Sequence, residues 1–425
     1  MAWLMLLFFV FLFLGFPIAF ILLAVSLIGA IFLLNNNPQI VVQMMFNGMN
    51  SYTILAVPFF IISGGIAARG GTAKSLINVM KKVFGKLPGG LGIATIFACT
   101  FFAAISGSSL ATIVALGTLM IPTLIGEGYD PEMATGIVNS AGSLGILIPP
   151  SVPMVTMSVA MGLSVAKLFA AGFLPGIILA IIWSVYVAIT CKRTGVGTKK
   201  TEEKERYGFK EFLKDVPALF FPIVILGSIY GGIATPTEAA AISIVYITII
   251  EVFYYKTCKL AELPAMFGKS TAEATIVSVM LGCAAPITWF VTNMQLPAAL
   301  SAAAQQYIPN KFVFIIALTL VLFVFGCFMD IISVIVILGP MVLPTLIMYG
   351  MDPIHFGIMC ILNTQIGMMT PPFGMNIFVC MRVANMGMGK VVKSTMPYLI
   401  LLIIATLVIS FIPEISMFVP NLLAS

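Results

Sequence analysis

The sequence predicts an all-α protein that crosses a membrane many times and is built around an inverted internal repeat. Three observations predict this fold class. Of the 425 residues, 60% are apolar and only 8% are charged; apolar stretches long enough to cross a bilayer recur along the chain; and a proline-containing segment returns 222 residues later. A mean hydropathy of +1.13 excludes a water-soluble domain of this size. A membrane β-barrel would show alternating segments of about ten residues, which the sequence lacks.

The lengths of the apolar stretches predict nine crossings and two hairpins. A bilayer core of about 30 Å needs about 20 apolar residues per helix. Two longer stretches have small or polar residues at their centres and are expected to enter and leave the membrane on one side. The expected crossings are 3–34, 50–68, 131–162, 166–191, 216–232, 236–255, 272–293, 352–381 and 396–420, and the expected hairpins are 90–126 and 312–348.

The positive charges predict how these segments are oriented. With the crossings above, 19 of the 21 Lys and Arg residues fall on one face, and only Lys167 and Lys311 lie opposite. The positive-inside rule makes that face cytoplasmic. We therefore expect a cytoplasmic amino terminus and a periplasmic carboxyl terminus. The net charge of +6 then reflects topology, and no nucleic-acid partner is expected.

Three basic stretches are expected to lie in the membrane interface. Residues 69–86, 256–269 and 382–393 mix apolar and basic residues near helical spacing. Two interpretations stay open, namely arms that link a moving part to a fixed part, and anchors to lipid headgroups. The charged segment 191–215 is expected to be a solvated linker. The seven cysteines are expected to be reduced packing residues.

One segment of the chain occurs twice. PTLIGEGYDP at 122–131 returns as PTLIMYGMDP at 344–353, and residues 101–150 match residues 323–372 at 15 of 50 positions without a gap. Shared proline, glycine and aspartate positions are hard to obtain by chance in apolar sequence. In the expected topology the two copies have opposite orientations. Many secondary transporters use such inverted repeats to create two access states around one site.

Each copy contains a hairpin followed by a broken crossing. The hairpin tips, SGSS at 106–109 and GCFMD at 326–330, lack the residues of a solvent loop, which favours re-entrant hairpins over pairs of full crossings. The broken crossings carry double prolines at 149–150 and 371–372. Proline leaves carbonyls of the preceding turn without partners. A kink satisfied by Ser or Thr would explain one break, but two breaks, each after a polar tip, favour cation sites.

Few carboxylates lie within the apolar segments. Asp330 is near the middle of one, where an ion is costly, and is expected to serve a cation or substrate site more than a structural hydrogen bond. Glu238 is expected to close a capping box with Thr235. The sequence contains no zinc-protease, P-loop or Rossmann motif, so ATP hydrolysis is not expected. The carboxylates expected to terminate helices are Glu127, Asp130 and Asp352.

Four motifs together resemble the large membrane subunit (M subunit) of tripartite ATP-independent periplasmic (TRAP) transporters: GIATPTEAAA at 232–241, SGSS at 106–109, LIPPS at 147–151 and TPP at 370–372. The resemblance spans nearly the whole chain. It implies an importer in the bacterial inner membrane that is driven by Na+ and carries organic acids such as C4-dicarboxylates or sialic acids by an elevator mechanism. It also implies two partners, a small four-helix membrane subunit (Q type) and a periplasmic substrate-binding protein (P type). An enzyme is not expected, because no nucleophile-base pair stands out in the sequence.

The resemblance also implies where ions and substrate bind. One sodium ion would lie between the first tip and the first break, held by Ser106, Ser108, Gly145, Ile148 and Pro149. A second would lie between the second tip and the second break, held by Gly326, Met329, Gly367 and Thr370. Polar tips and broken helices are expected to converge on a substrate cavity, for which the candidates are Ser108, Ser109, Asn139, Asp330 and Asn363.

The repeat predicts a moving transport domain within a fixed scaffold. The transport domain would take 89–162 and 310–385, one repeat copy each, and the scaffold and arms would take 1–88, 163–309 and 386–425. Within transport, a stand-alone sodium-carboxylate carrier stays open as an alternative. The alternative from another class is a channel with re-entrant pore loops, although the two unlike tips argue against a symmetric filter.

Overall fold

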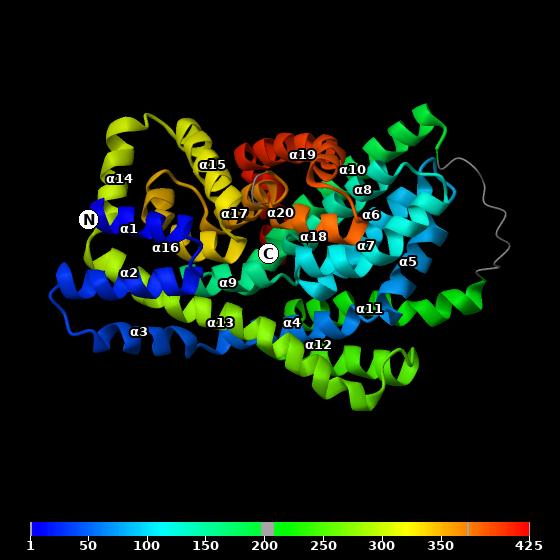
Figure 1. Ribbon diagram of the computed structural model, residues 1–425, viewed down its shortest axis with the longest axis horizontal. Helices are drawn as coiled ribbons and strands as arrows, with labels where there is room; N and C mark the ends of the chain where they lie inside the picture. Colours follow the sequence, from blue (N-terminus) through cyan, green and yellow to red (C-terminus); the bar gives the residue numbers. More distant parts are fainter. Residues whose placement is uncertain (1, 197–207, 372–373, 425) are drawn as a thin grey trace.

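The computed structural model describes residues 2–196, 208–371 and 374–424, and this part of the chain is helical without any β-strand. Within it, eight helices are long and apolar enough to cross a membrane, or nine if the bent pair Gln39–Met49 and Tyr52–Ala67 counts as one crossing. Figure 1 shows the long helix α13 (Leu263–Asn293) along one edge beside α3; among the later helices, α9 and α16 pack against it. The all-α polytopic fold is confirmed.

The amino-terminal helices form one side of the bundle, where α2, α3 and α4 pack against α13. The stretch expected as one crossing at 3–34 is instead two helices. Gly15 takes a φ of 78°, and Pro17 has no N–H with which to continue the first helix. The helices here are α1 (Ala2–Phe13), α2 (Ile18–Phe32), α3 (Gln39–Met49), η1 (Tyr52–Leu55), α4 (Ala56–Ala67) and α5 (Gly71–Phe84).

Hairpin 1 and the first broken crossing follow α5. The double proline at 149–150 interrupts the crossing as expected, because no helix runs from Leu147 to Ser151. Asp130 starts the crossing as an N-cap, accepting a hydrogen bond from the Glu132 N–H at 3.1 Å. Hairpin 1 is α6 (Gly90–Ser106) and α7 (Ser109–Gly126), and the broken crossing is α8 (Pro131–Ser143), η2 (Leu144–Ile146) and α9 (Val152–Met161).

The middle of the chain supplies further long helices. The expected capping box at the start of α12 is confirmed, since the Thr235 N–H donates to Glu238 at 2.7 Å and the Glu238 N–H donates to Thr235 Oγ1 at 3.3 Å. The basic stretch at 256–269 is not a separate arm, because its second half, from Leu263 on, continues into the crossing as part of α13. The other elements are α10 (Val165–Thr194), α11 (Phe209–Tyr230), α12 (Pro236–Ile249), the π-helical η3 (Ile250–Tyr254) and η4 (Leu260–Glu262).

The second repeat copy reproduces the first. α16 (Ile331–Met348) and α17 (Pro353–Met368) begin 222 residues after α7 and α8, as the sequence repeat requires. Asp352 caps α17 as Asp130 caps α8. The copy is completed by α15 (Lys311–Phe328), which forms hairpin 2 with α16, and by α18 (Met375–Ala384). Pro372 of the second double proline lies outside the described residues.

The two copies exchange partners. α9, the second half of the first broken crossing, packs on α16 of hairpin 2, and α18, the second half of the other, packs on α7 of hairpin 1. Such reciprocal pairing is what two copies related by a two-fold axis produce. It brings both hairpin tips and both breaks into one bundle. The orientation of the bundle relative to the membrane stays a prediction.

α10 and the carboxyl-terminal helices pack onto this bundle. α19 (Met388–Phe411) lies against α8 and α17, and α10 lies against α6, α9 and α17. The indole N–H of Trp183 in α10 donates to the Tyr398 carbonyl in α19 at 3.2 Å, and both residues are buried. The crossing expected at 396–420 is interrupted at Ile412, after which α20 (Pro413–Ala424) begins and packs on α10.

Two short helices precede the two hairpins at equivalent places. α5 comes before hairpin 1 and falls within the basic stretch expected as an interfacial arm. α14 (Leu296–Tyr307) comes before hairpin 2 and was not anticipated, because it carries no basic residue. α5 is well embedded, with eight buried residues, whereas none of the residues of α14 is buried.

Candidate functional site

Each hairpin tip meets the break of its own repeat copy. We call these two places junction 1, formed by residues 106–109 and 144–151, and junction 2, formed by residues 326–330 and 366–371. Both lie where regular helices end, so backbone groups are left without their usual helical partners. In each junction a glycine of the broken crossing contacts backbone atoms of the tip.

Backbone conformation shapes the tip of hairpin 1. Gly107 ends α6 in the left-handed region, with a φ of 59°, and its N–H donates to the Ala103 carbonyl at 2.9 Å. Ser108 is extended and caps α7, so that its Oγ accepts from the Ala111 N–H at 3.4 Å. The chain therefore reverses within two residues, and the Ser108 carbonyl is left beside the side chains of both arms.

Three oxygen atoms gather at this tip. Ser106 Oγ and Thr112 Oγ1 lie 2.8 Å apart, and they donate to the Ser108 carbonyl oxygen at 3.2 and 2.8 Å. Ser106 and Thr112 are buried. Small hard cations prefer oxygen ligands, and sodium sites in transporters use carbonyls of unwound helix. The donor set of junction 1 therefore fits a sodium ion.

Gly145 lets the first break approach this tip. A Cβ at Gly145 would lie 2.6 Å from the Ser108 carbonyl oxygen and 2.9 Å from the Ser109 nitrogen, closer than real Cβ atoms come. The structure thus brings Gly145 to Ser108, as the sequence predicts. On the other side of the break, the Val152 N–H donates to the Gly107 carbonyl at 3.4 Å.

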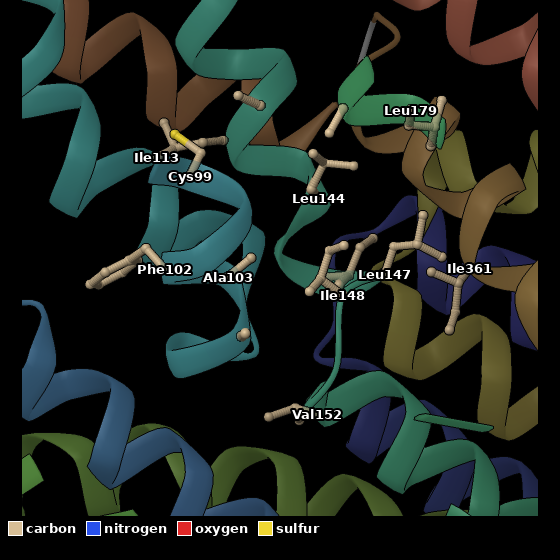
Figure 2. Packing of buried hydrophobic residues seen from close by; sticks show 14 of the residues in the cluster. Cys99, Phe102, Ala103, Ile113, Leu144, Leu147, Ile148, Val152, Leu179 and Ile361 are labelled. Atoms are coloured by element: carbon tan, nitrogen blue, oxygen red, sulfur yellow. The ribbon is translucent and has the colours of Figure 1, made fainter. Parts of the chain in front are cut away.

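Apolar side chains surround junction 1. Figure 2 shows Leu144, Leu147 and Ile148 of the break among apolar residues of the neighbouring helices. Ile148 directs its side chain to α10, where a Cβ on Gly176 would lie 2.1 Å from Ile148 Cδ1. The Ile148 and Pro149 side chains have no ligating atom, so only their carbonyls could hold an ion. Ser151 closes the break by donating to the Ile146 carbonyl at 2.7 Å.

Junction 2 repeats the close approach with different side chains. A Cβ at Gly367 would lie 2.4 Å from the Gly326 carbonyl oxygen, and one at Gly326 would lie 2.9 Å from Thr364 Cα. Met329 is buried at the end of α15. Thr370 Oγ1 donates to the Ile366 carbonyl at 2.7 Å within the second break. Gly326 and Gly367 are therefore together, as expected.

Asp330 occupies the position in repeat 2 that Ser108 occupies in repeat 1. Its Oδ2 accepts from the N–H groups of Ile332 and Ser333 at 3.0 and 3.1 Å, and its Oδ1 accepts from the Ser333 hydroxyl. A carboxylate is favourable at a helix N-terminus. The side chain is half-buried, and its capping role is a structural hydrogen bond. A role in a cation or substrate site stays a prediction.

The remaining candidates differ in their surroundings. Ser109 Oγ donates to Asn376 Oδ1 at 3.0 Å, which ties tip 1 to α18 of the other repeat copy. Asn363 donates within its own helix to the Met359 carbonyl at 2.8 Å. Asn139 donates to Thr395 Oγ1 in α19 at 2.9 Å, so this amide serves the packing of α8 on α19 and is not hydrogen-bonded to a tip.

Sequence reasoning named Asn363 but missed two other buried polar residues near the junctions, Gln365 and Asn376. In the described structure, the side chains of Asn363, Gln365 and Asn376 are buried and each has one polar atom without a hydrogen-bond partner. Gln365 Nε2 also donates to Ser143 Oγ at 2.6 Å, which joins the two broken crossings. A buried polar atom without a partner is costly, so these atoms mark places for an ion, a ligand or water. Polar residues within an apolar broken crossing were the available signal.

Within the described residues, no three His, Cys, Asp or Glu side chains come together as metal ligands. Transition-metal chemistry therefore has no ligand cluster there. The oxygen atoms at the junctions belong to hydroxyls and carbonyls, and at junction 2 also to the Asp330 carboxylate.

Residues 5–415 match the model of the family described as "Tripartite ATP-independent periplasmic transporter, DctM component". The chain is 36% identical over 405 residues to a C4-dicarboxylate TRAP transporter large permease protein of Pseudomonas aeruginosa, covering 94% of each. It is 35% identical to an isethionate TRAP transporter permease protein, DctMQ, of Oleidesulfovibrio alaskensis, covering 96% of this chain and 64% of that protein.

Two further similarities extend this result. The chain is 34% identical to an ectoine/5-hydroxyectoine TRAP transporter large permease protein of Ruegeria pomeroyi, covering 97% of each. Its fold resembles the crystal structure of the YdaH transporter of Alcanivorax borkumensis, with a TM-score of 0.63 over 87% of this chain and 86% of that one. At 13% identity, the second similarity concerns the fold alone.

Proposed function

Because the chain belongs to the DctM family of tripartite ATP-independent periplasmic transporters, we propose that it is the large permease of a sodium-driven importer of an organic acid anion. Membership makes it a multi-pass inner-membrane transport component that works with a periplasmic binding protein and a small membrane subunit. Beyond family membership, we propose that sodium is the coupling ion, that an organic acid is the substrate and that transport uses an elevator movement.

The paired junctions carry the proposal of sodium coupling. Each is a place where a hairpin tip touches a broken crossing through a glycine, and junction 1 gathers three oxygen atoms that suit sodium. Because the ion would bridge two elements, its binding would favour the arrangement in which tip and break are closed on each other. Sodium bound at the junctions would thereby shape the substrate cavity between them.

The substrate proposal rests on the polar groups between the repeats. Ser109, Asn376 and Gln365 supply hydrogen-bond donors and acceptors where the two copies meet. Relatives are named for a C4-dicarboxylate, isethionate and ectoine, which all carry an acidic group but differ in size and charge. We propose an acidic solute of the C4-dicarboxylate or sialic acid type, recognised by neutral donors and by the positive ends of half-helices.

Packing supports an elevator in which the moving unit is larger than the two repeat copies. α10 packs on α6, α9 and α17, α19 packs on α8 and α17, and Trp183 of α10 and Tyr398 of α19 are buried and hydrogen-bonded to each other, so these helices would not slide freely on the repeat copies. We therefore include α10, α19 and α20 with the transport domain. The contact of α13 with α9 and α16 is different, since it holds a cavity of about 390 Å³ lined by residues such as Ala284 and Val336. A loosely packed interface is where sliding would occur.

The decisive experiment is uptake into proteoliposomes that hold this chain and its small subunit, with and without the periplasmic binding protein. A panel of labelled organic acids would be tested with and without an inward sodium gradient. We expect uptake of one acid to require both the gradient and the binding protein. Uptake that is equal without sodium would contradict the proposed coupling.

The same experiment separates the alternatives. A stand-alone sodium-carboxylate carrier would take up substrate without the binding protein. A channel with re-entrant pore loops would show single-channel currents in a planar bilayer and would not accumulate substrate against its gradient. The unlike tips, with Ser108 in one and Asp330 at the matching position of the other, favour the transporter.

A further inference from the structure

Glu251 is a fully buried carboxylate that neither junction uses. It lies in the π-helical segment η3 that follows α12, and it has one distant partner, Thr72, and one local partner, Thr257. Glu251 Oε1 accepts from the Thr72 N–H at 2.7 Å and from Thr72 Oγ1 at 2.6 Å, and its Oε2 accepts from the Thr257 hydroxyl. A buried carboxylate with several donors is stabilised in one position.

These contacts cap the amino-terminal end of α5. The residue at the N-cap position of α5 is Gly70, which has no side chain to satisfy the free N–H groups of the first turn. Glu251 supplies that acceptor from another helix, and its negative charge faces the positive end of the α5 dipole. The cap of α5 is thus supplied by η3, which continues α12, and not by the residues that precede α5.

The two glycines before Thr72 make room for this arrangement. Gly70 takes a φ of 128°, which other residues rarely adopt. A Cβ on Gly71 would lie 2.5 Å from Glu251 Oε2 and 2.9 Å from the Tyr255 Cβ. The turn into α5 is therefore shaped around the Glu251 carboxylate, and any larger residue at position 71 would displace it.

The equivalent helix of the second repeat copy has no such attachment in the described structure. α14 begins after Gln295, which makes no side-chain capping hydrogen bond, and none of its residues is buried. α5 buries eight residues and packs against α11 as well as α6. The two helices that lead into the hairpins are therefore attached to the rest of the molecule in different ways.

We propose that Glu251 is a positioning residue that fixes α5 to α12, so that α5 stays with the scaffold while hairpin 1 moves. The hinge of this copy is then the segment after α5, residues 85–90, where Gly85, Pro88 and the left-handed Gly89 interrupt the helix. The proposal rests on the proposed elevator function. It assigns α5, which forms most of the basic stretch 69–86, to the scaffold and not to the transport domain.

The test measures distances between spin labels in the complete complex in lipid nanodiscs. One label pair joins α5 to the scaffold, at Lys82→Cys and Val245→Cys, and the other joins α5 to hairpin 1, at Lys82→Cys and Val114→Cys. All three positions are exposed. Between sodium-free and sodium-plus-substrate conditions, we expect the first distance to stay constant and the second to shift. A shift of the first with a constant second would overturn the proposal.

Variants of the anchor give a second readout. In Glu251→Ala the distance distribution between Lys82→Cys and Val245→Cys should broaden, whereas Glu251→Gln, which keeps an acceptor for Thr72, should broaden it less. The matched control is Glu238→Ala on the same helix, whose partner Thr235 is local and exposed, and it should leave the distribution unchanged. If the distance distribution is unchanged in a folded Glu251→Ala protein, the proposed positioning role of Glu251 is also overturned.

Kinetics distinguish this role from a general loss of stability. We expect Glu251→Ala to lower the maximal rate of uptake by about fivefold with the half-saturating substrate concentration nearly unchanged, because the substrate site is not touched. If neither label distance responds to sodium and substrate, the elevator function fails. The width of the Lys82→Cys to Val245→Cys distance distribution in Glu251→Ala then still tests whether Glu251 fixes α5 to α12.

Discussion

Single glycines set how closely each hairpin tip approaches its broken crossing. Gly145 and Gly367 occupy matching places in the two repeat copies, and a Cβ on either would overlap backbone atoms of the tip. Backbone contacts of this kind cannot be relieved by moving a flexible side chain. The positions are therefore expected to be sensitive to the smallest possible enlargement, a single methyl group.

We predict that Gly145→Ala lowers the apparent sodium affinity of uptake by about tenfold or more. Overpacking costs about 1–3 kcal/mol, and here the strain falls on the closed tip and break that would hold the ion. The measurement is sodium-dependent uptake in proteoliposomes at several sodium concentrations. Gly126→Ala is the control, because a Cβ there meets no atom within 4 Å. Equal sodium dependence of both variants would contradict sodium binding at junction 1.

We predict that the native chain reacts slowly with maleimide at pH 7. The seven cysteines are buried, and burial raises the pKa of the Cys258 thiol, which lies between two membrane segments. A raised pKa leaves less of the reactive thiolate at pH 7, so the labelling rate should increase as the pH rises toward the thiol pKa. The measurement is mass spectrometry of labelled protein over time. Rapid, pH-independent labelling of Cys258 would show that it is exposed.

Capping residues at the hairpin tips determine where the second arm of each hairpin begins. Ser108 caps α7 and Asp330 caps α16, at positions 222 residues apart in the two repeat copies. Ser and Asp are both good N-caps, so the local structure is kept while the charge at the tip differs. The two junctions therefore share a shape and differ in electrostatics.

We predict that Asp330→Asn separates capping from charge. Asn caps a helix about as well as Asp, so hairpin 2 should keep its thermal stability, whereas Asp330→Ala should lose about 0.5–2 kcal/mol. If the charge serves sodium or substrate, Asp330→Asn should still reduce uptake about tenfold. Asp352→Asn, at the cap of α17, is the control for a change of cap alone. Full uptake by Asp330→Asn would leave Asp330 with a structural role only.

At the scale of the whole molecule, two kinds of interface divide the helices. α8, α10, α17 and α19 share a buried interface with hydrogen bonds between α8 and α19 and between α10 and α19. The interface of α13 with α9 and α16 holds a cavity and the contact of Ser333 Oγ with Met280 Sδ at 3.5 Å. A rigid-body movement would preserve the first interface and change the second.

We predict opposite effects of two cross-links. A short cross-link between Asn139→Cys and Thr395→Cys joins parts that would move together, so transport should continue. One between Met280→Cys and Ser333→Cys joins scaffold to transport domain and should abolish it. Both pairs start from side chains in contact, at 2.9 and 3.5 Å, and the single variants and the reduced proteins are the controls. Transport by the cross-linked Met280→Cys/Ser333→Cys protein would contradict the elevator.

The sequence by itself determined the class of protein and its internal plan. The lengths of the apolar stretches predict membrane crossings, and prolines 149–150 predict a broken helix, because both effects act within a few turns of a helix. The 222-residue repeat predicts two copies of one unit, because it can be seen in the sequence alone. These features do not depend on which distant segments come together. The placement of Gly145 and Gly367 beside the tips came from the resemblance to the TRAP family.

Only the tertiary structure decided what is packed against what. The hydrogen bonds from Ser109 to Asn376 and from Thr72 to Glu251 join residues 267 and 179 positions apart, so no local sequence pattern predicts them. The placement of α10 and α19 on the repeat copies, and the helix α14 without basic residues, also depend on long-range packing. Burial turns an ordinary Glu within an apolar run into an anchor, and burial is a property of the folded chain alone.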